Sequence, residues 1–358
     1  MIMVVKVKKI VLFLIMLSFP ILVSADNNYK VVKHYIDSEI EISGNLRVKE
    51  LLIVDGEIDY LLRTLNYNSF GGKWDGKTIN LENGEIYNAL NIYNFACSAY
   101  KYNNEEININ DLGKDVTYFK ELDPKKVSDK TFNIKTKDGE NDYYIYYQSS
   151  GLTAFYLEYV IGNTVVSHND IKELNYTFKN LNYVPKTTLL RVLIPYPTSD
   201  ESYHAFLHGA KGGYEDIEKD GQKYGIVAVY ENLKGSPNVR ITMPLDQVPI
   251  DINTNKSNID ALDKIIEIED KLSANSQKGK TINKYAKLVL ISLSILYVLV
   301  GIYIYKNSNK VLLLIYTVLG LLLCLFNYLF KTEIYYIYLV ILAPILLFII
   351  NKIKERKN

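Results

Sequence analysis

Three long apolar runs lie near the C-terminal end of the chain, at 288–305, 311–330 and 334–350, separated only by the short polar segments KNSNK and KTE. A helix needs about 17 to 25 apolar residues to cross a hydrocarbon core of roughly 30 Å, and none of the runs contains a charge. The pattern therefore predicts three transmembrane helices within 288–350. The residues after them, 351–358, form a basic tail.

The N-terminus has the pattern of a secretory signal. A basic start, MIMVVKVKK, precedes an apolar stretch from Ile10 to Val23 and the small residues Val-Ser-Ala before Asp26. We expect a signal peptide at 1–25 that is cleaved, although an uncleaved leader would add a fourth span. With cleavage, the protein is a multi-pass cell-membrane protein, with 26–287 extracytoplasmic and the C-terminus cytoplasmic. The lysine and arginine bias across the spans supports this orientation only weakly.

Period-two alternation dominates the exported part. The alternating residues Glu39–Ile42 and Leu46–Leu51 flank a Ser-Gly-Asn turn, which is typical of an antiparallel hairpin with one buried face. Similar segments recur at 143–148, 153–161, 171–178, 187–194, 224–230 and 239–243. The pattern predicts a mainly β ectodomain, an antiparallel β-sandwich of one or two units. We place the first unit at 26–150 and the second at 151–252.

Two other segments interrupt this pattern. Between Ser69 and Asp142 the apolar positions are scattered, so we expect loops and short strands there, with a helix around Gly84–Ala99 as an option. After Pro249, apolar residues recur at helical spacing behind Ser257, and Asp260 follows it by three residues as in a capping box. This predicts a membrane-proximal helix at 257–275, ended by SQKGK.

Charge and cysteine content exclude some classes of protein. Segment 26–287 holds 38 of the 40 acidic residues, all but Glu333 and Glu355, and 31 of the 41 basic ones, which gives a net charge of −7. An acidic surface offers no footprint for nucleic acid. The two cysteines, Cys97 and Cys324, fall in the exported part and in the second predicted span, so no internal disulfide is available.

The region from Phe155 to Pro249 resembles a known family. The segments that carry the likeness are FYLEYVIGNTVVSHNDIKELNYTF, VPKTTLLRVLIPYP, AFLHGAKGG and NLKGSPNVRITMP. In order and spacing they are similar to the family of predicted membrane proteins called domain of unknown function 2207, in its N-terminal extracytoplasmic domain. The resemblance implies a signal peptide, an extracytoplasmic β domain and C-terminal spans, and it supplies no catalytic residue. The chain departs from the family in its consecutive spans and short basic tail.

Candidate chemistry is sparse. His204 and His208, in HAFLHG, could share a metal on a helix, but the zinc motif HExxH needs a Glu where Ala205 stands, and zinc takes three or four ligands. We expect these histidines to be structural, as we do His168 in SHND. Acidic pairs such as Glu105 with Glu106 or Asp216 with Glu218 are too common here to indicate catalysis. We therefore assign no catalytic, cofactor-binding or metal-binding residue and no cofactor.

Abundant tyrosine suggests a binding function, and an enzymatic function is the alternative. Thirty-one tyrosines occur, and the cluster Tyr143, Tyr144, Tyr146 and Tyr147 suggests carbohydrate or peptide binding, although alternation in a strand would bury about half of them. The favoured hypothesis is a binding or scaffolding protein of the cell envelope, not an enzyme, whose partners are the lipid bilayer and another envelope protein or a surface polymer. The alternative is an extracytoplasmic enzyme that acts on envelope material. A deep pocket lined by carboxylates would favour the enzyme, and an exposed aromatic face would favour binding.

Overall fold

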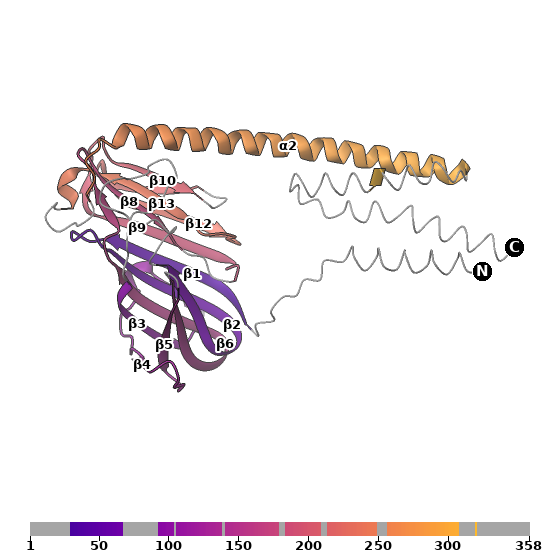
Figure 1. Cartoon of the computed structure of the whole chain (residues 1–358). Coiled ribbons are helices and arrows are strands. Elements are labelled where there is room, and N and C mark those ends of the chain that lie inside the picture. Colours follow the sequence, from indigo (N-terminus) through magenta and orange to yellow (C-terminus); the bar gives the residue numbers. More distant parts are fainter. Residues whose placement is uncertain are drawn as a thin grey trace. The chain divides into compact units, whose positions relative to one another are not determined.

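The computed structural model (Figure 1) describes residues 29–66, 92–103, 105–137, 140–178, 183–208, 213–248, 256–307 and 319–320. The predicted signal peptide at 1–25 and the basic tail at 351–358 lie outside these ranges. So do the second and third predicted spans, 311–330 and 334–350, apart from Leu319 and Gly320.

The described part of the chain is mostly β. Its strands are β1 (Tyr29–Ile40), β2 (Leu46–Asn66), β3 (Ile92–Lys101), β4 (Lys120–Glu121), β5 (Thr131–Lys137), β6 (Glu140–Ile161), β7 (Val165–Ser167), β8 (Lys172–Thr177), β9 (Thr187–Thr198), β10 (His204–His208), β11 (Glu215–Lys219), β12 (Gln222–Glu231) and β13 (Asn238–Met243). Nine form a mixed sheet in the order β11-β12-β9-β1-β2-β6-β5-β4, with β3 also paired to β6. Four form a second sheet in the order β10-β13-β8-β7.

The predicted N-terminal hairpin is confirmed. Strands β1 and β2 pair antiparallel, with Ile40 opposite Leu46, and Gly44 in the turn has a φ of 80°. Only glycine adopts this left-handed conformation without a steric cost. Strand β1 pairs on its other side with β9, in parallel. The helix considered around Gly84–Ala99 is wrong for the described part of that segment, because residues 92–101 form strand β3.

One hydrophobic core joins the two sheets. It combines inward residues of the large sheet, such as Leu52 and Phe155, with Leu174 and Ile241 of the small sheet. Outward residues of β2, among them Leu51, belong to a second apolar cluster on the opposite face. Because both faces of β2 are covered here, the sequence Leu-Leu-Ile-Val at 51–54 is continuously apolar rather than alternating.

Strand β6 is the longest element of the large sheet, with 22 residues. It pairs with β2 over almost its whole length, and β5 and β3 share its other side, β5 along 140–146 and β3 along 153–161. The boundary that the sequence suggested near Ser149–Gly151 falls inside β6, where Gly151 has a φ of 74°.

Helix α2 (Leu262–Asn307) follows the sheets. Asp170 caps its start, because the backbone amides of Ala261 and Leu262 donate to its two carboxylate oxygens at 2.8 and 2.9 Å. The helix begins five residues after Ser257 and continues through SQKGK, so the predicted break is absent.

The transmembrane prediction is corrected by the same helix. Among the described residues, no helix combines the length and the apolar character that a crossing requires. The first predicted span, 288–305, is not a separate helix but the C-terminal part of α2, whose N-terminal part carries charged residues such as Asp263, Lys264 and Lys271. The predicted fold class with a helical membrane block, the transmembrane assignment and the multi-pass localisation are therefore wrong for the structure described.

Candidate functional site

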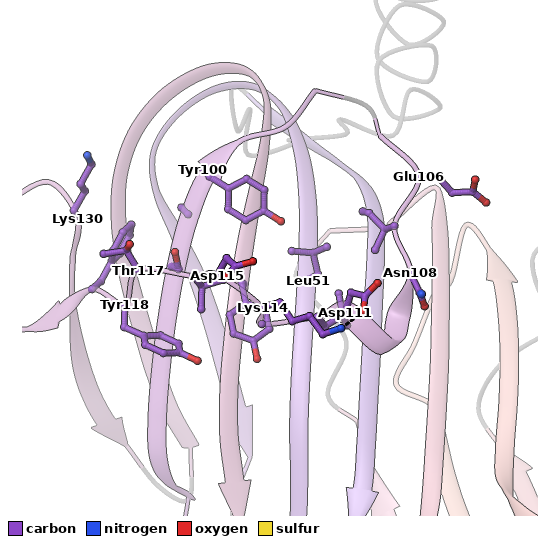
Figure 2. Close-up of a pocket in the computed structure, with 18 residues that line it drawn as sticks. Leu51, Tyr100, Glu106, Asn108, Asp111, Lys114, Asp115, Thr117, Tyr118 and Lys130 are labelled. Carbon is purple, nitrogen blue, oxygen red and sulfur yellow. Dashed lines mark hydrogen bonds and ion pairs between the residues drawn. The ribbon is translucent and has the colours of Figure 1, made fainter.

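A cavity of about 680 Å³ lies on the outer face of the large sheet, beneath the segment 105–119. Leu51 of β2, Ser98 of β3 and Tyr156 of β6 line it from the sheet side. The segment itself supplies most of the remaining lining (Figure 2). The cavity is thus built from three neighbouring strands and one loop.

Backbone hydrogen bonds fasten the chain to the sheet just before this segment and at its end. The amide of Tyr102 donates to the carbonyl of Leu152 at 3.1 Å, and the amide of Phe119 donates to the carbonyl of Cys97 at 2.8 Å. Between them, Leu112 is buried in the apolar cluster that contains Leu51. The chain is therefore attached to the sheet before segment 105–119, in its middle and at its end.

Gly113 lets the segment approach the sheet closely. Its φ is 84°, and a Cβ atom at this position would lie 2.7 Å from Cζ of Tyr156. The Tyr156 hydroxyl lies beside the glycine and donates to Glu158 at 3.0 Å. A larger residue would both strain the backbone and displace the tyrosine.

Aromatic and polar residues line the cavity together. Tyr100 and Tyr118 remain 42% and 48% exposed although they line it. Partial burial raises the pKa of both phenols, so each hydroxyl is a donor at neutral pH. The other polar lining residues include Glu106, Asn108, Asp111, Lys114, Asp115, Thr117 and Lys130, all labelled in Figure 2.

Some charged residues of this lining form an ion pair with each other and others do not contact an opposite charge within the lining. Lys114 forms an ion pair with Asp111, whereas Asp115 and Glu106 are exposed. Asn108 uses its side-chain oxygen to cap the 3-10 helix η1 (Ile109–Asp111) through the amide of Asn110. The cavity thus presents acceptors, such as Glu106 and Asp115, and donors, such as Tyr100 and Lys130.

Elsewhere the structure buries two similar networks of histidine, glutamate and arginine. In the first, Glu50 accepts from Arg63 at 2.8 and 2.9 Å, contacts Nε2 of His34 at 3.0 Å, and accepts from the Tyr159 hydroxyl. All four residues are at most 2% exposed. Burial alone would raise the pKa of Glu50, but Arg63 and His34 outweigh it and lower that pKa. Burial lowers the pKa of His34, so the imidazole is neutral.

The second network lies at the small sheet. Glu173 accepts from Nε of Arg240 at 2.6 Å and contacts Nε2 of His168 at 2.8 Å. Burial would raise the pKa of Glu173, yet the Arg240 and His168 partners lower it. The other ring nitrogen of His168, Nδ1, contacts the hydroxyl of Ser257. This serine is only half-buried, so the network reaches the surface there.

The histidines singled out in the sequence do not meet. His204 and His208 are the first and last residues of strand β10 rather than part of a loop. Four residues of strand span roughly 13 Å, too far for two side chains to share one ion. In the described part of the chain, no group of three or more His, Cys, Asp or Glu side chains is placed to hold a metal.

The other sequence candidates lie at three different places in the structure. Asp216 and Glu218 both accept from Nζ of Lys223, at 2.9 and 2.6 Å, in an exposed surface group. Of the acidic pair at 105–106, Glu106 lines the cavity. In the tyrosine cluster, Tyr143 is buried, whereas Tyr144 and Tyr146 lie beside Tyr60 with ring centroids 5.8 and 6.0 Å from it.

Comparisons with known proteins give little further guidance. No protein-family model and no curated protein matches the sequence. Among solved structures, the chain is similar to a candidate protease from Parabacteroides distasonis, with 12% identity, a TM-score of 0.32, and coverage of 61% of this chain and 41% of that one.

Two further structures are similar at the same level. For yeast LTA4 hydrolase in complex with bestatin, the identity is 7%, the TM-score is 0.33, and coverage is 63% of this chain and 32% of that one. For an M1 zinc metallopeptidase variant from Deinococcus radiodurans, bound to a Tyr-Ser-Ala substrate, the identity is 10%, the TM-score is 0.30, and coverage is 60% and 42%. The chain spans less than half the length of each of these proteins. We draw no conclusion about activity from likenesses this weak.

Proposed function

We propose that this β protein is a binding module and that its ligand is a hydroxyl-rich surface polymer, a polysaccharide, held in the cavity beneath segment 105–119. The observation that supports this proposal is the composition of that cavity. Two half-exposed tyrosines, Tyr100 and Tyr118, stand among carboxylate and amide acceptors in a space of about 680 Å³.

Each part of the lining suits a sugar chain. Aromatic rings pack against the apolar C–H faces of sugar rings, and tyrosine adds a hydroxyl that hydrogen-bonds at the rim. Sugar hydroxyls are donors, and hydrogen bonds to ionised acceptors such as Glu106 and Asp115 are stronger than those to neutral ones. A cavity of this volume lies in the usual range for a specific small-ligand or oligomer site.

A partner-protein segment is the other ligand class that fits tyrosines and carboxylates, and the experiment separates the two. The full chain is applied to an array of polysaccharides and to an array of peptides of matched length. We expect retention on one or more polysaccharides, with a loss of at least tenfold in affinity for Tyr100→Ala and for Tyr118→Ala.

The matched control is Tyr196→Ala, since Tyr196 is 51% exposed and does not line the cavity. This variant should bind like the wild type. Retention on peptides alone would replace the polysaccharide by a protein partner. Polysaccharide binding that survives both cavity substitutions would refute the assignment of the site.

A further inference from the structure

We propose that Ser257 is an activated nucleophile and that Ser257, His168 and Glu173 form the centre of a second, hydrolytic activity toward carboxylic esters. The proposal does not depend on the polysaccharide site. It rests on the direction of three consecutive hydrogen bonds and on the exposure of the residue at their end.

The direction of each bond is fixed by the chemistry of its partners. Arg240 can only donate, so Nε–H points to Oε1 of Glu173. Glu173 has its pKa lowered by these partners and, as a carboxylate, can only accept, so Nε2 of His168 must donate to Oε2. When the imidazole of His168 carries its single proton on Nε2, Nδ1 is an acceptor. In that tautomer the hydroxyl of Ser257 donates to Nδ1 of His168.

This order is that of a nucleophile, a general base and a group that orients the base. In triads of this kind the base takes the hydroxyl proton through its unprotonated nitrogen, and the buried carboxylate fixes the tautomer and orientation of the ring. Whether that nitrogen is Nδ1 or Nε2 does not change the proton transfer. His168 is 3% exposed and Glu173 is fully buried, whereas Ser257 reaches solvent between the exposed residues Lys256 and Asn258.

The first network shows that the serine is not needed for a His–Glu–Arg group to be buried. His34 has the same kind of partners, Glu50 and Arg63, but its second nitrogen, Nδ1, is buried with no hydrogen-bond partner. A hydroxyl at that place is therefore an addition specific to His168. The backbone of Ser257 is also held in place, because the amide of Ser257 donates to the carbonyl of Ser167 at 2.8 Å.

The proposed reaction balances in two steps. Oγ of Ser257 attacks the ester carbonyl carbon while its proton passes to Nδ1 of His168, and the alcohol leaves with that proton, so an acyl-serine remains. Water then attacks the acyl carbon, gives a proton to Nδ1, and releases the carboxylic acid as the proton returns to Ser257.

The test uses a fluorophosphonate probe, which forms a stable bond to an activated serine oxygen and releases fluoride. The full chain is incubated with the probe and the modified residue is mapped by peptide mass spectrometry. We expect labelling at Ser257, its loss in Ser257→Ala, and a fall in labelling rate of about 100-fold or more in His168→Gln, as for removal of a general base. Because His168 is buried, each variant is first compared with the wild type by circular dichroism.

The matched control is Ser43→Ala. Ser43 is also half-buried, but its hydroxyl donates to a carboxylate, Glu41, and no histidine adjoins it. This variant should be labelled like the wild type. Absence of label on Ser257 in the folded wild-type chain, or equal labelling rates for wild type and a folded His168→Gln, would overturn the proposal and leave Ser257 as a structural contact. Since these readouts involve no polysaccharide, they are independent of the binding test.

Discussion

Replacing Glu50 by glutamine should be among the most damaging single changes in this protein. The substitution keeps the size of the side chain but removes the charge that faces Arg63, at 2.8 and 2.9 Å, in a site where Glu50 is fully buried. Breaking a buried ion pair on one side costs about 3 to 5 kcal/mol, because the remaining charge stays out of water without compensation. Single domains are stable by only about 5 to 15 kcal/mol, so this loss is a large fraction of the total.

Urea unfolding followed by circular dichroism measures the effect. We expect the midpoint to fall while the slope of the unfolding free energy against urea stays constant, as it does when stability changes but the unfolded state does not. The double variant Glu50→Gln/Arg63→Met should lose less than the sum of the two single variants, because it also removes the stranded charge.

The exposed Glu57 provides the control, since Glu57→Gln should change stability by less than about 0.5 kcal/mol. A loss below about 1 kcal/mol for Glu50→Gln would contradict the view that this network is desolvated and paired. Additive single and double variants would show that Glu50 and Arg63 do not interact.

Three other predictions test separate features. Burial lowers the pKa of His34 below the ordinary value of 6.5, so the neutral imidazole stabilises the fold above about pH 6.5. This contribution should be lost as the pH falls below that value, and urea titrations should show a flatter dependence of stability on pH in His34→Gln. Gly225 has a φ of 137°, and a Cβ added there would lie 2.9 Å from the Cα of Leu193, so Gly225→Ala should lower the melting temperature markedly. In the control Gly221→Ala the added Cβ would meet no atom within 4 Å, so only the strain of a positive φ should lower the melting temperature. Cys97 is buried and burial raises its thiol pKa, so a thiol reagent should modify it only after unfolding, and faster reaction in the native state would contradict its placement.

The sequence predicted the strands better than it predicted their partners. Alternation around Gly44 was sufficient to predict the β1–β2 hairpin, because both strands and their turn are local. The parallel pairing of β1 with β9 was not predictable in this way, since it joins residues about 154 positions apart, such as His34 and Thr188. The sequence does not reveal that one helix spans Leu262–Asn307, because its charged first part and its apolar last part form two different patterns.

The candidate sites were missed for the same reason. Glu50 and Arg63 are 13 residues apart, His168 and Ser257 are 89 apart, and Glu173 and Arg240 are 67 apart, so no short motif contains either network. A weak signal did exist. A charged residue amid an apolar strand, as Glu50 is between Val48 and Leu52, either faces solvent or is buried with a partner, and here it is buried.

The most direct measurement of the binding proposal is hydrogen–deuterium exchange of the full chain with and without a saturating fragment of the polysaccharide that the array identifies. We predict that protection on binding concentrates in residues 105–119 and in the neighbouring end of β3, around Tyr100, with little change in β10 to β13. Protection confined to the small sheet, or none in segment 105–119, would contradict the claim that this cavity is the binding site.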